Sequence, residues 1–422
     1  MKFPRLFRLV GPALAAGPSR GARHDRNGLP ASGSPTPLAL IAFALLAAIP
    51  LSAADVKITD SVEVQAARAA WVKAKGYKVH YTEKFDLSEL PVYVPTEKVT
   101  GTIRMWGSNY FTDSPLAGWW EEEFRKFHPD VTFDFHLNTT QHAIPGLIFG
   151  MSDIGPMGRE IMWDELLSFQ REHKRLPTGI SAVTGSYDVS GWNPAIGVFV
   201  HKDNPLAQLS LEQLDGIFGA ERSGAWRALT WDKSLARGPE KNIRTWGQLG
   251  LTGEWADRPI NVYGYNLQFH FPQEMETKAF GGVSKKWNEK LREYDNEARP
   301  DGSFKLAGQI MVEDLAQDRF GIAYVAGGAL WKTEATKLLP LSVKTGGPAY
   351  ELNLHNVRER TYPFYGEVFF FINRDPARPV DPKVREFMRY VLSREGQAQV
   401  MRDGKYLPLT AEVVREERRK LE

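Results

Sequence analysis

The sequence predicts an α/β fold with a mainly parallel sheet in the first half of the chain. Between residues 101 and 173, apolar runs that alternate like strands are each followed by a run with helical spacing. This order of strand and helix, repeated three times, is typical of a sheet covered by helices. The chain has 422 residues, which is enough for two or three such units with full cores.

The first strand and helix of this series are the clearest. GTIRMWG at 101–107 reads as a strand, and SPLAGWWEEEFRKFHPD at 114–130 reads as a helix. Ser114 can cap this helix, and Pro115 suits its first position. One face of the helix carries the apolar side chains Leu116, Trp120, Phe124 and Phe127. Their spacing predicts that this face is buried.

The rest of the chain predicts further strands and helices. The predicted strands are 131–137, 152–155, 194–205, 257–262, 319–328 and 362–376. The predicted helices are a short one within 138–150, then 162–173, 209–220, 272–280 and a pair within 381–404 that is capped at Asp381. The long apolar strand at 194–205 indicates that the chain leaves a first unit there and enters a second.

Residues 1–54 have the composition of an export leader. They hold six Lys or Arg and one acid, and the apolar core of PLALIAFALLAAIPLSAAD at 37–55 has the length of a signal peptide. Ser52 and Ala54 suit a small-x-small cleavage site, so we expect cleavage near Ala54 and export to the periplasm. The alternative is a buried core helix, which Pro50 disfavours.

The composition excludes several classes of function. The chain has no cysteine, so it forms no disulfide, thiolate metal site or cysteine nucleophile, and it has no cysteine for a lipid anchor. The formal net charge is +2 for the whole chain and about −3 once the leader is removed. This balance does not indicate a nucleic-acid-binding face.

No enzyme motif stands in a suitable place in the sequence. GPSRG at 17–21 fits the serine-hydrolase pattern GxSxG but lies in the leader, and neither a Walker A sequence nor HExxH is present. His128, His136 and His142 do not have the spacing of metal ligands on a helix. We therefore expect a protein that is not an enzyme and has no metal or cofactor.

Polar side chains follow three predicted strands of the first unit. The three corners are 107–109, 138–141 and 158–160. Because the strands belong to one predicted sheet, their ends can meet at its carboxyl edge, where α/β proteins bind ligands. The candidate anion ligands at these corners are Ser108, Asn109, Thr139, Thr140 and Arg159. The alternative is that these residues only cap helices.

Several stretches resemble the phosphate-binding periplasmic proteins of ABC transporters. The stretches are SDIGPMGREI, HKDNPLAQLSLEQLDGIFGA, VEDLAQDRFGIAYVAGG, YPFYGEVFFFINRDP and VREFMRYVLSREGQAQVMRDGKYLPLT. They occur in the family's order and cover about residues 101–415.

The resemblance implies a type II periplasmic-binding-protein-like fold, in which two α/β lobes are joined by two crossovers and a ligand cleft lies between them. It places lobe one at 101–197 plus 360–422 and lobe two at 198–359. Residues 55–100 are then an N-terminal extension that follows the leader at 1–54.

The resemblance also implies roles for single residues. Ser108 matches the family's first glycine–serine corner, and 138–141 matches its G-S/T-S/T-G loop without either glycine. Arg159 is retained, but Gly158 stands where the family has serine. Some members also have an aspartate near this point that accepts a hydrogen bond from the protonated anion; no carboxylate stands at Gly158, and Glu160 is the nearest substitute. The family's R-x-x-x-S-G-T corner falls on YGYNLQFHF at 263–271, where Asn266 and Gln268 complete the set of candidate ligands.

Two classes of function follow from the resemblance. The first is an exported solute-binding protein that takes phosphate or a related oxyanion to the permease of an ABC importer, as a monomer. The second keeps the fold but changes the role, either by binding an organic or sugar-like solute on the aromatic rings of 263–271 or by serving as an envelope binding module without transport. A hydrolase ranks below both because no nucleophile and base are paired in the sequence.

Overall fold

The computed structural model describes residues 78–227, 229–281, 284–298 and 304–422, all of which belong to one compact unit. The predicted leader and its cleavage site near Ala54 lie outside the described residues. Within the described residues, the strands form two main sheets, and the buried apolar side chains form a separate core around each. The predicted α/β fold with two lobes is confirmed.

The sheet of the first lobe contains the predicted strands and one more. β1 (Gly101–Trp106) and β2 (Val131–His136) pair in parallel. A parallel bridge between Met105 and Ile154 joins them to the strands that follow. These are β3 (Gly155–Met157), β16 (Glu367–Ile372) and β4 (Thr178–Thr184), in that spatial order.

The sheet is mainly parallel, as residues 101–173 predict, but it contains one antiparallel strand among the described residues, β16, for which the sequence predicts no direction. β16 lies between β3 and β4 and runs antiparallel to both of them. The paired residues are 212–216 positions apart in sequence for β3 and 183–194 for β4, so β16 enters the sheet after the chain has returned from the second lobe. The local sequence pattern predicts that these residues form a strand, but it does not predict whether the strand runs parallel or antiparallel to its neighbours.

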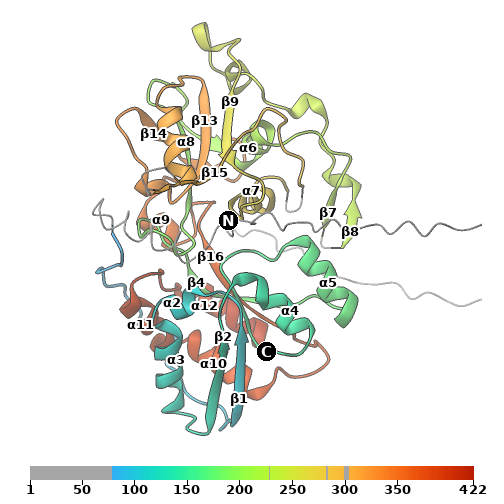
Figure 1. Ribbon diagram of the computed structural model, residues 1–422, viewed down its shortest axis with the longest axis vertical. Helices are drawn as coiled ribbons and strands as arrows, with labels where there is room; N and C mark the ends of the chain where they lie inside the picture. Colours follow the sequence, from blue (N-terminus) through green and yellow to red (C-terminus); the bar gives the residue numbers. More distant parts are fainter. Residues whose placement is uncertain (1–77, 228, 282–283, 299–303) are drawn as a thin grey trace, which may run out of the picture. The chain divides into compact units, whose positions relative to one another are not determined.

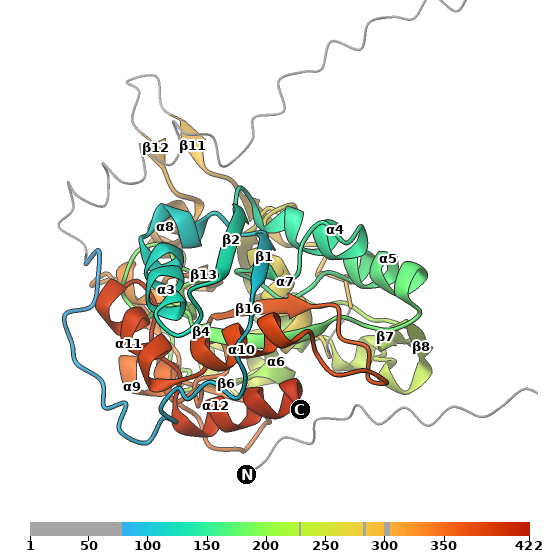
Figure 2. The same cartoon turned by 90° about the horizontal axis from the view of Figure 1, so that it is seen from below.

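Helices cover both faces of the first sheet. α3 (Leu116–Arg125) lies on one side of β1 and β2, and α4 (Ala143–Ile148) and α5 (Trp163–His173) lie on the other (Figures 1 and 2). α3 begins one residue later than predicted, because Pro115 is its N-cap and Leu116 its first residue. The hydroxyl of Ser114 still accepts a hydrogen bond from the backbone N–H of Leu116 at 3.3 Å. The C-terminal helices α10 (Pro382–Val391), α11 (Arg394–Asp403) and α12 (Ala411–Arg418) complete this lobe.

The sheet of the second lobe is mixed. Its spatial order is β10 (Arg292–Tyr294), β9 (Asn261–Tyr265), β13 (Gly321–Ala326), β5 (Ile196–His201) and β14 (Thr336–Leu338). β10, β9 and β13 are parallel, whereas β5 pairs antiparallel with β13 and with β14. The helices of this lobe are α6 (Leu211–Phe218), α7 (Phe271–Lys278), α8 (Ala307–Leu315) and α9 (Leu354–Arg358).

Two crossovers connect the lobes, between β4 and β5 and between α9 and β16. In the first, Gly191, Trp192 and Asn193 all have positive φ, at 81°, 60° and 51°. Non-glycine residues rarely adopt this conformation, which is found mainly where the surroundings enforce it. Here the crossovers are tightly packed, because a Cβ atom on Gly366 would lie 1.9 Å from the carbonyl oxygen of Asn193. The residue boundaries predicted for the lobes remain a prediction.

Residues 78–100, which we call the strap, run along the first lobe as an extended segment (Figure 2). Four of its apolar side chains are buried in the core of that lobe: Leu87, Leu90, Tyr93 and Val99. The strap also reaches the first crossover, where the hydroxyl of Tyr81 accepts from the backbone N–H of Tyr187 at 2.7 Å. The described part of the predicted N-terminal extension is therefore an integral part of the folded unit.

Candidate functional site

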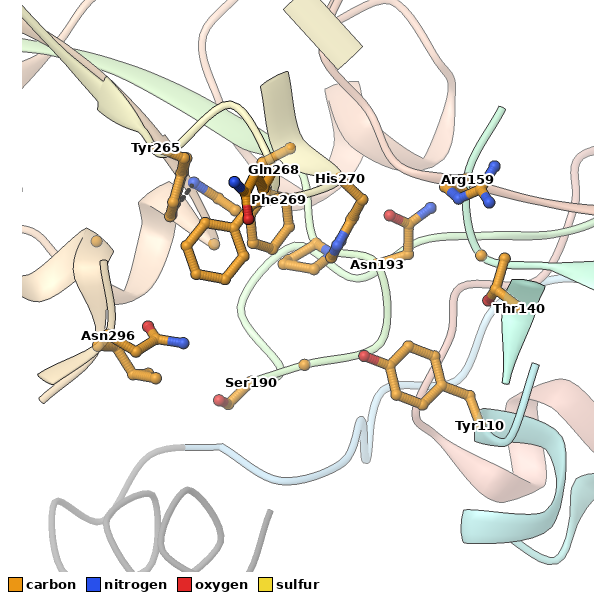
Figure 3. A pocket seen from close by; sticks show the side chains of 18 of the residues that line it. Tyr110, Thr140, Arg159, Ser190, Asn193, Tyr265, Gln268, Phe269, His270 and Asn296 are labelled. Carbon is orange, nitrogen blue, oxygen red and sulfur yellow. Dashed lines mark hydrogen bonds between the residues drawn. The ribbon is translucent and has the colours of Figure 1, made fainter. Parts of the chain in front are cut away.

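A cavity of about 250 Å³ lies between residues of the first lobe and residues of the second. Figure 3 shows Tyr110, Thr140 and Arg159 on one side of it and Tyr265, Phe269 and Asn296 on the other. The two sides differ in chemistry, so each is described in turn.

The first-lobe wall is formed by the three predicted corners. Its lining residues there are Asn109, Thr139, Thr140, Gln141, Gly158 and Arg159. The strands β1, β2 and β3 end immediately before these corners. β1 and β2 pair in parallel, and the parallel bridge between Met105 and Ile154 places the start of β3 beside β1. The prediction that the three corners meet at one edge of the sheet is therefore confirmed. The wall presents hydroxyl and amide groups and one guanidinium to the cavity.

Arg159 is held in place by an ion pair with α5. Its two terminal nitrogens donate to the carboxylate of Glu165 at 2.8 and 2.7 Å, and one of them also donates to the carbonyl oxygen of Glu160 at 2.9 Å. Arg159 is only 5% exposed, so this bidentate pair is largely shielded from water. Glu165 offsets most of the positive charge that Arg159 brings to the cavity.

Two predicted ligands do not line the cavity. Ser108 is buried, its backbone N–H donates to the carbonyl oxygen of Pro156 at 2.9 Å, and its hydroxyl accepts weakly from Tyr110 at 3.4 Å. The side-chain amide of Asn266 donates to Asp295 at 3.1 Å, and its oxygen accepts from the backbone of Gln268 at 2.9 Å. Both residues shape corners, whereas Asn109 and Gln268 beside them line the cavity.

Glu160 is not among the cavity-lining residues, although the sequence made it a substitute for an anion-reading carboxylate. Burial, together with the nearby carboxylates of Glu367 and Glu274, raises the pKa of Glu160 to about 8. The cations Lys278 and Lys420 oppose this rise but do not cancel it. At pH 7 the side chain of Glu160 is therefore mostly neutral.

The second-lobe wall is rich in rings. Tyr265, Phe269, His270 and Phe271 come from the stretch 263–271, which joins β9 to α7. The centroid of the Tyr265 ring lies 4.7 Å from the centroid of the Phe271 ring and 5.9 Å from that of the Phe269 ring. Leu306, Leu330 and Trp331 extend this apolar surface. The aromatic corner thus contributes one wall of the cavity, and Tyr265 also packs in the core.

Several lining residues were not predicted from the sequence. Ser190, Gly191, Asn193 and Pro194 belong to the first crossover, and Asn296, Gly308 and Gly327 belong to loops and helix starts of the second lobe. The run SGWNP at 190–194 carries the composition of a turn, which was the available signal. Its position beside the three corners depends on how the two lobes pack, and no local pattern encodes that.

Comparison with known proteins identifies the family. No protein-family model matches the chain. The phosphate-binding protein PstS of Pseudomonas aeruginosa is 30% identical over 328 residues, which cover 77% of this chain and 88% of that protein. The chain belongs to the PstS family of phosphate-binding proteins. The family that its motifs resemble is therefore confirmed.

Two further proteins share less sequence identity with this PstS-family chain. Protein SphX of Synechococcus elongatus is 23% identical over 302 residues, which cover 70% of the chain and 75% of SphX. The solved structure of PstS from Borrelia burgdorferi is 14% identical, covers 74% of the chain and 100% of its own length, and has a TM-score of 0.44.

Among the described residues, no three His, Cys, Asp or Glu side chains gather in a cluster that could hold a metal ion. Over the same part of the chain, no helix is both long and apolar enough to cross a bilayer.

Proposed function

We propose that this chain is an exported solute-binding protein that binds phosphate or a related oxyanion in the cavity between its lobes. It would deliver this ligand in the periplasm to the permease of an ABC importer, and it would act by binding rather than by catalysis. The observation that carries the proposal is the meeting of three polar corners on one wall of the cavity, in a chain of the PstS family.

The first-lobe wall suits a small oxyanion. Threonine hydroxyls can donate to one oxygen and accept from a protonated one, and the amides of Asn109 and Gln141 add N–H donors. Arg159 has donor capacity beyond the three bonds that hold it to Glu165 and Glu160, since a guanidinium carries five N–H groups. Neutral donors around a paired arginine can satisfy the oxygens of an anion while adding little net charge.

The crossovers give this function a mechanism. A ligand that contacts both walls gains interactions only when the lobes are close together, so its binding favours the closed arrangement. Water leaves the cavity when the walls approach each other, and the hydrogen bonds to the anion become stronger. The ligand is then enclosed until the lobes separate again.

Titration calorimetry tests the proposal. Phosphate, sulfate and molybdate are titrated into the chain from residue 55 onward, and into the variants Thr140→Ala and Thr132→Ala. We expect phosphate to bind the unmodified chain and Thr140→Ala to weaken binding by about tenfold, which is about 1.4 kcal/mol. Thr132 is an exposed residue of β2 and serves as the matched control. The absence of heat with all three anions would contradict the proposal.

A further inference from the structure

The apolar residues of the cavity are unevenly divided between its walls. Seven of them come from the second lobe: Tyr265, Phe269, Phe271, Leu306, Ala326, Leu330 and Trp331. The first lobe contributes Tyr110 and Met162, and the first crossover contributes Pro194. One wall of the cavity is therefore suited to an oxyanion, and the opposite wall is suited to an apolar group (Figure 3).

The polar atoms of two of these rings already have backbone partners. The hydroxyl of Tyr265 accepts from the backbone N–H of Ala326 at 3.0 Å. The indole N–H of Trp331 donates to the carbonyl oxygen of the same residue at 2.9 Å. These bonds hold both rings against β13, so that what they offer a ligand is mainly apolar surface.

The cavity is also larger than a bare oxyanion needs. Phosphate has five non-hydrogen atoms, and even at the volume of liquid water, about 30 Å³ for each, it fills roughly 150 Å³. The cavity measures about 250 Å³. A phosphate seated on the three corners thus leaves space beside the second-lobe wall. Gln268, His270 and Asn296 also line that wall, but an oxygen that faces its apolar part around Phe269 would lose hydrogen bonds to water without replacement.

We propose that the cavity takes an oxyanion that carries an organic group, namely a phosphate monoester or a phosphonate. The anionic head lies on the corners that contain Thr140 and Arg159. The organic group lies against Phe269 and its apolar neighbours. The inference rests on the proposed function, since it assumes that the same cavity binds an oxyanion, and it adds the class of ligand.

A comparison of the affinities of three probes tests this inference. Phenylphosphonate, methylphosphonate and inorganic phosphate are titrated separately into the chain by calorimetry at pH 7. Methylphosphonate controls for the loss of one oxygen, because it has the same head as phenylphosphonate and almost no apolar surface. We expect phenylphosphonate to bind at least about tenfold more tightly than either of the others.

Substitutions in the second-lobe wall test whether its apolar side chains cause the preference for phenylphosphonate. We expect Phe269→Ala to lower the ratio of phenylphosphonate affinity to phosphate affinity by at least about fivefold. Phe269→Leu is measured as well, in case the alanine variant folds poorly, and the same effect is expected. Leu267→Ala is the matched control, since Leu267 is 40% exposed in the same corner and does not line the cavity. This control should leave the ratio unchanged.

The outcomes separate the inference from the function on which it rests. If phosphate binds as tightly as phenylphosphonate or more tightly, the organic ligand class is wrong and the proposed function stands. The class is also wrong if the Phe269 variants keep the ratio of the unmodified chain. If none of the three probes binds, the organic ligand class is wrong, and the proposed function is also wrong if sulfate and molybdate give no heat either.

Discussion

At the scale of single residues, Arg159 provides the one guanidinium among the described residues of the first-lobe wall of the cavity, and Glu165 holds it in place. Its place after a strand, next to a helix start, was enough to make it a candidate ligand. Its bidentate pairing with Glu165 was not predicted, although the two residues are only six positions apart. The pairing depends on the path of the corner between β3 and α5, which places the carboxylate beside the guanidinium.

Replacing Arg159 tests its role in the site. We expect Arg159→Ala to weaken phosphate binding at least tenfold, about 1.4 kcal/mol, as measured by calorimetry. The change also leaves Glu165 without its buried partner, so the variant Arg159→Ala/Glu165→Gln is measured beside it to separate folding from binding. Arg171→Ala, at an exposed position of α5, is the control. Unchanged affinity in the Arg159 variants would remove this residue from the site.

Glu160 predicts a pH dependence of stability. Its pKa in the folded chain is about 8, against a usual value of 4.5, so between these pH values the folded chain holds a proton that the unfolded chain has released. The free energy of unfolding therefore falls as pH rises from about 4.5 to about 8, by at most about 1.4 kcal/mol per pH unit from this group. We expect Glu160→Gln to reduce that fall.

Urea unfolding at several pH values between 5 and 9 measures this effect. Glu172→Gln provides the control, because Glu172 is an exposed residue of α5. If the unmodified chain and Glu160→Gln lose stability with pH at the same rate, the raised pKa of Glu160 is wrong.

At the scale of elements, the strands and the corners after them were largely predictable. Alternating and continuous apolar runs predicted β1, β2, β5, β13 and β16, because strand periodicity is a local property. The strand predicted at 257–262 shares only its last two residues with β9. β4 and α12 were not predicted. The antiparallel direction of β16 and the cavity lining contributed by the first crossover were also missed, because both depend on packing between segments that are distant in sequence.

The strap makes a testable contribution to the first lobe. The hydroxyl of Tyr93 donates to the buried carboxylate of Glu386 at 2.8 Å and lies 2.7 Å from the ring nitrogen Nε2 of His128. Tyr93→Phe removes the hydroxyl and leaves these buried groups with one partner fewer, which costs about 1–3 kcal/mol. We expect a loss of stability of this size in urea unfolding.

The matched control for the strap is Tyr350→Phe, at a partly exposed position of the second lobe. It should change the free energy of unfolding by less than about 0.5 kcal/mol. If Tyr93→Phe is no more destabilising than this control, the strap does not stabilise the lobe through this hydroxyl.

At the scale of the whole molecule, two walls of different chemistry face one cavity. The polar wall comes from strand ends of the first lobe, and the ring-rich wall comes mainly from the corner between β9 and α7 of the second lobe. The sequence showed both sets of residues and the family in which they occur. It did not show which of these residues face the cavity, because their orientation depends on where the crossovers place the two lobes in the folded chain.

The most direct test of the central claim is a crystal structure of the chain grown with phosphate. The account predicts a phosphate in the cavity between the lobes, hydrogen-bonded by residues of the three first-lobe corners, among them Thr140 and Arg159. A phosphate bound elsewhere on the chain, with the cavity free of it at a saturating concentration, would contradict the account.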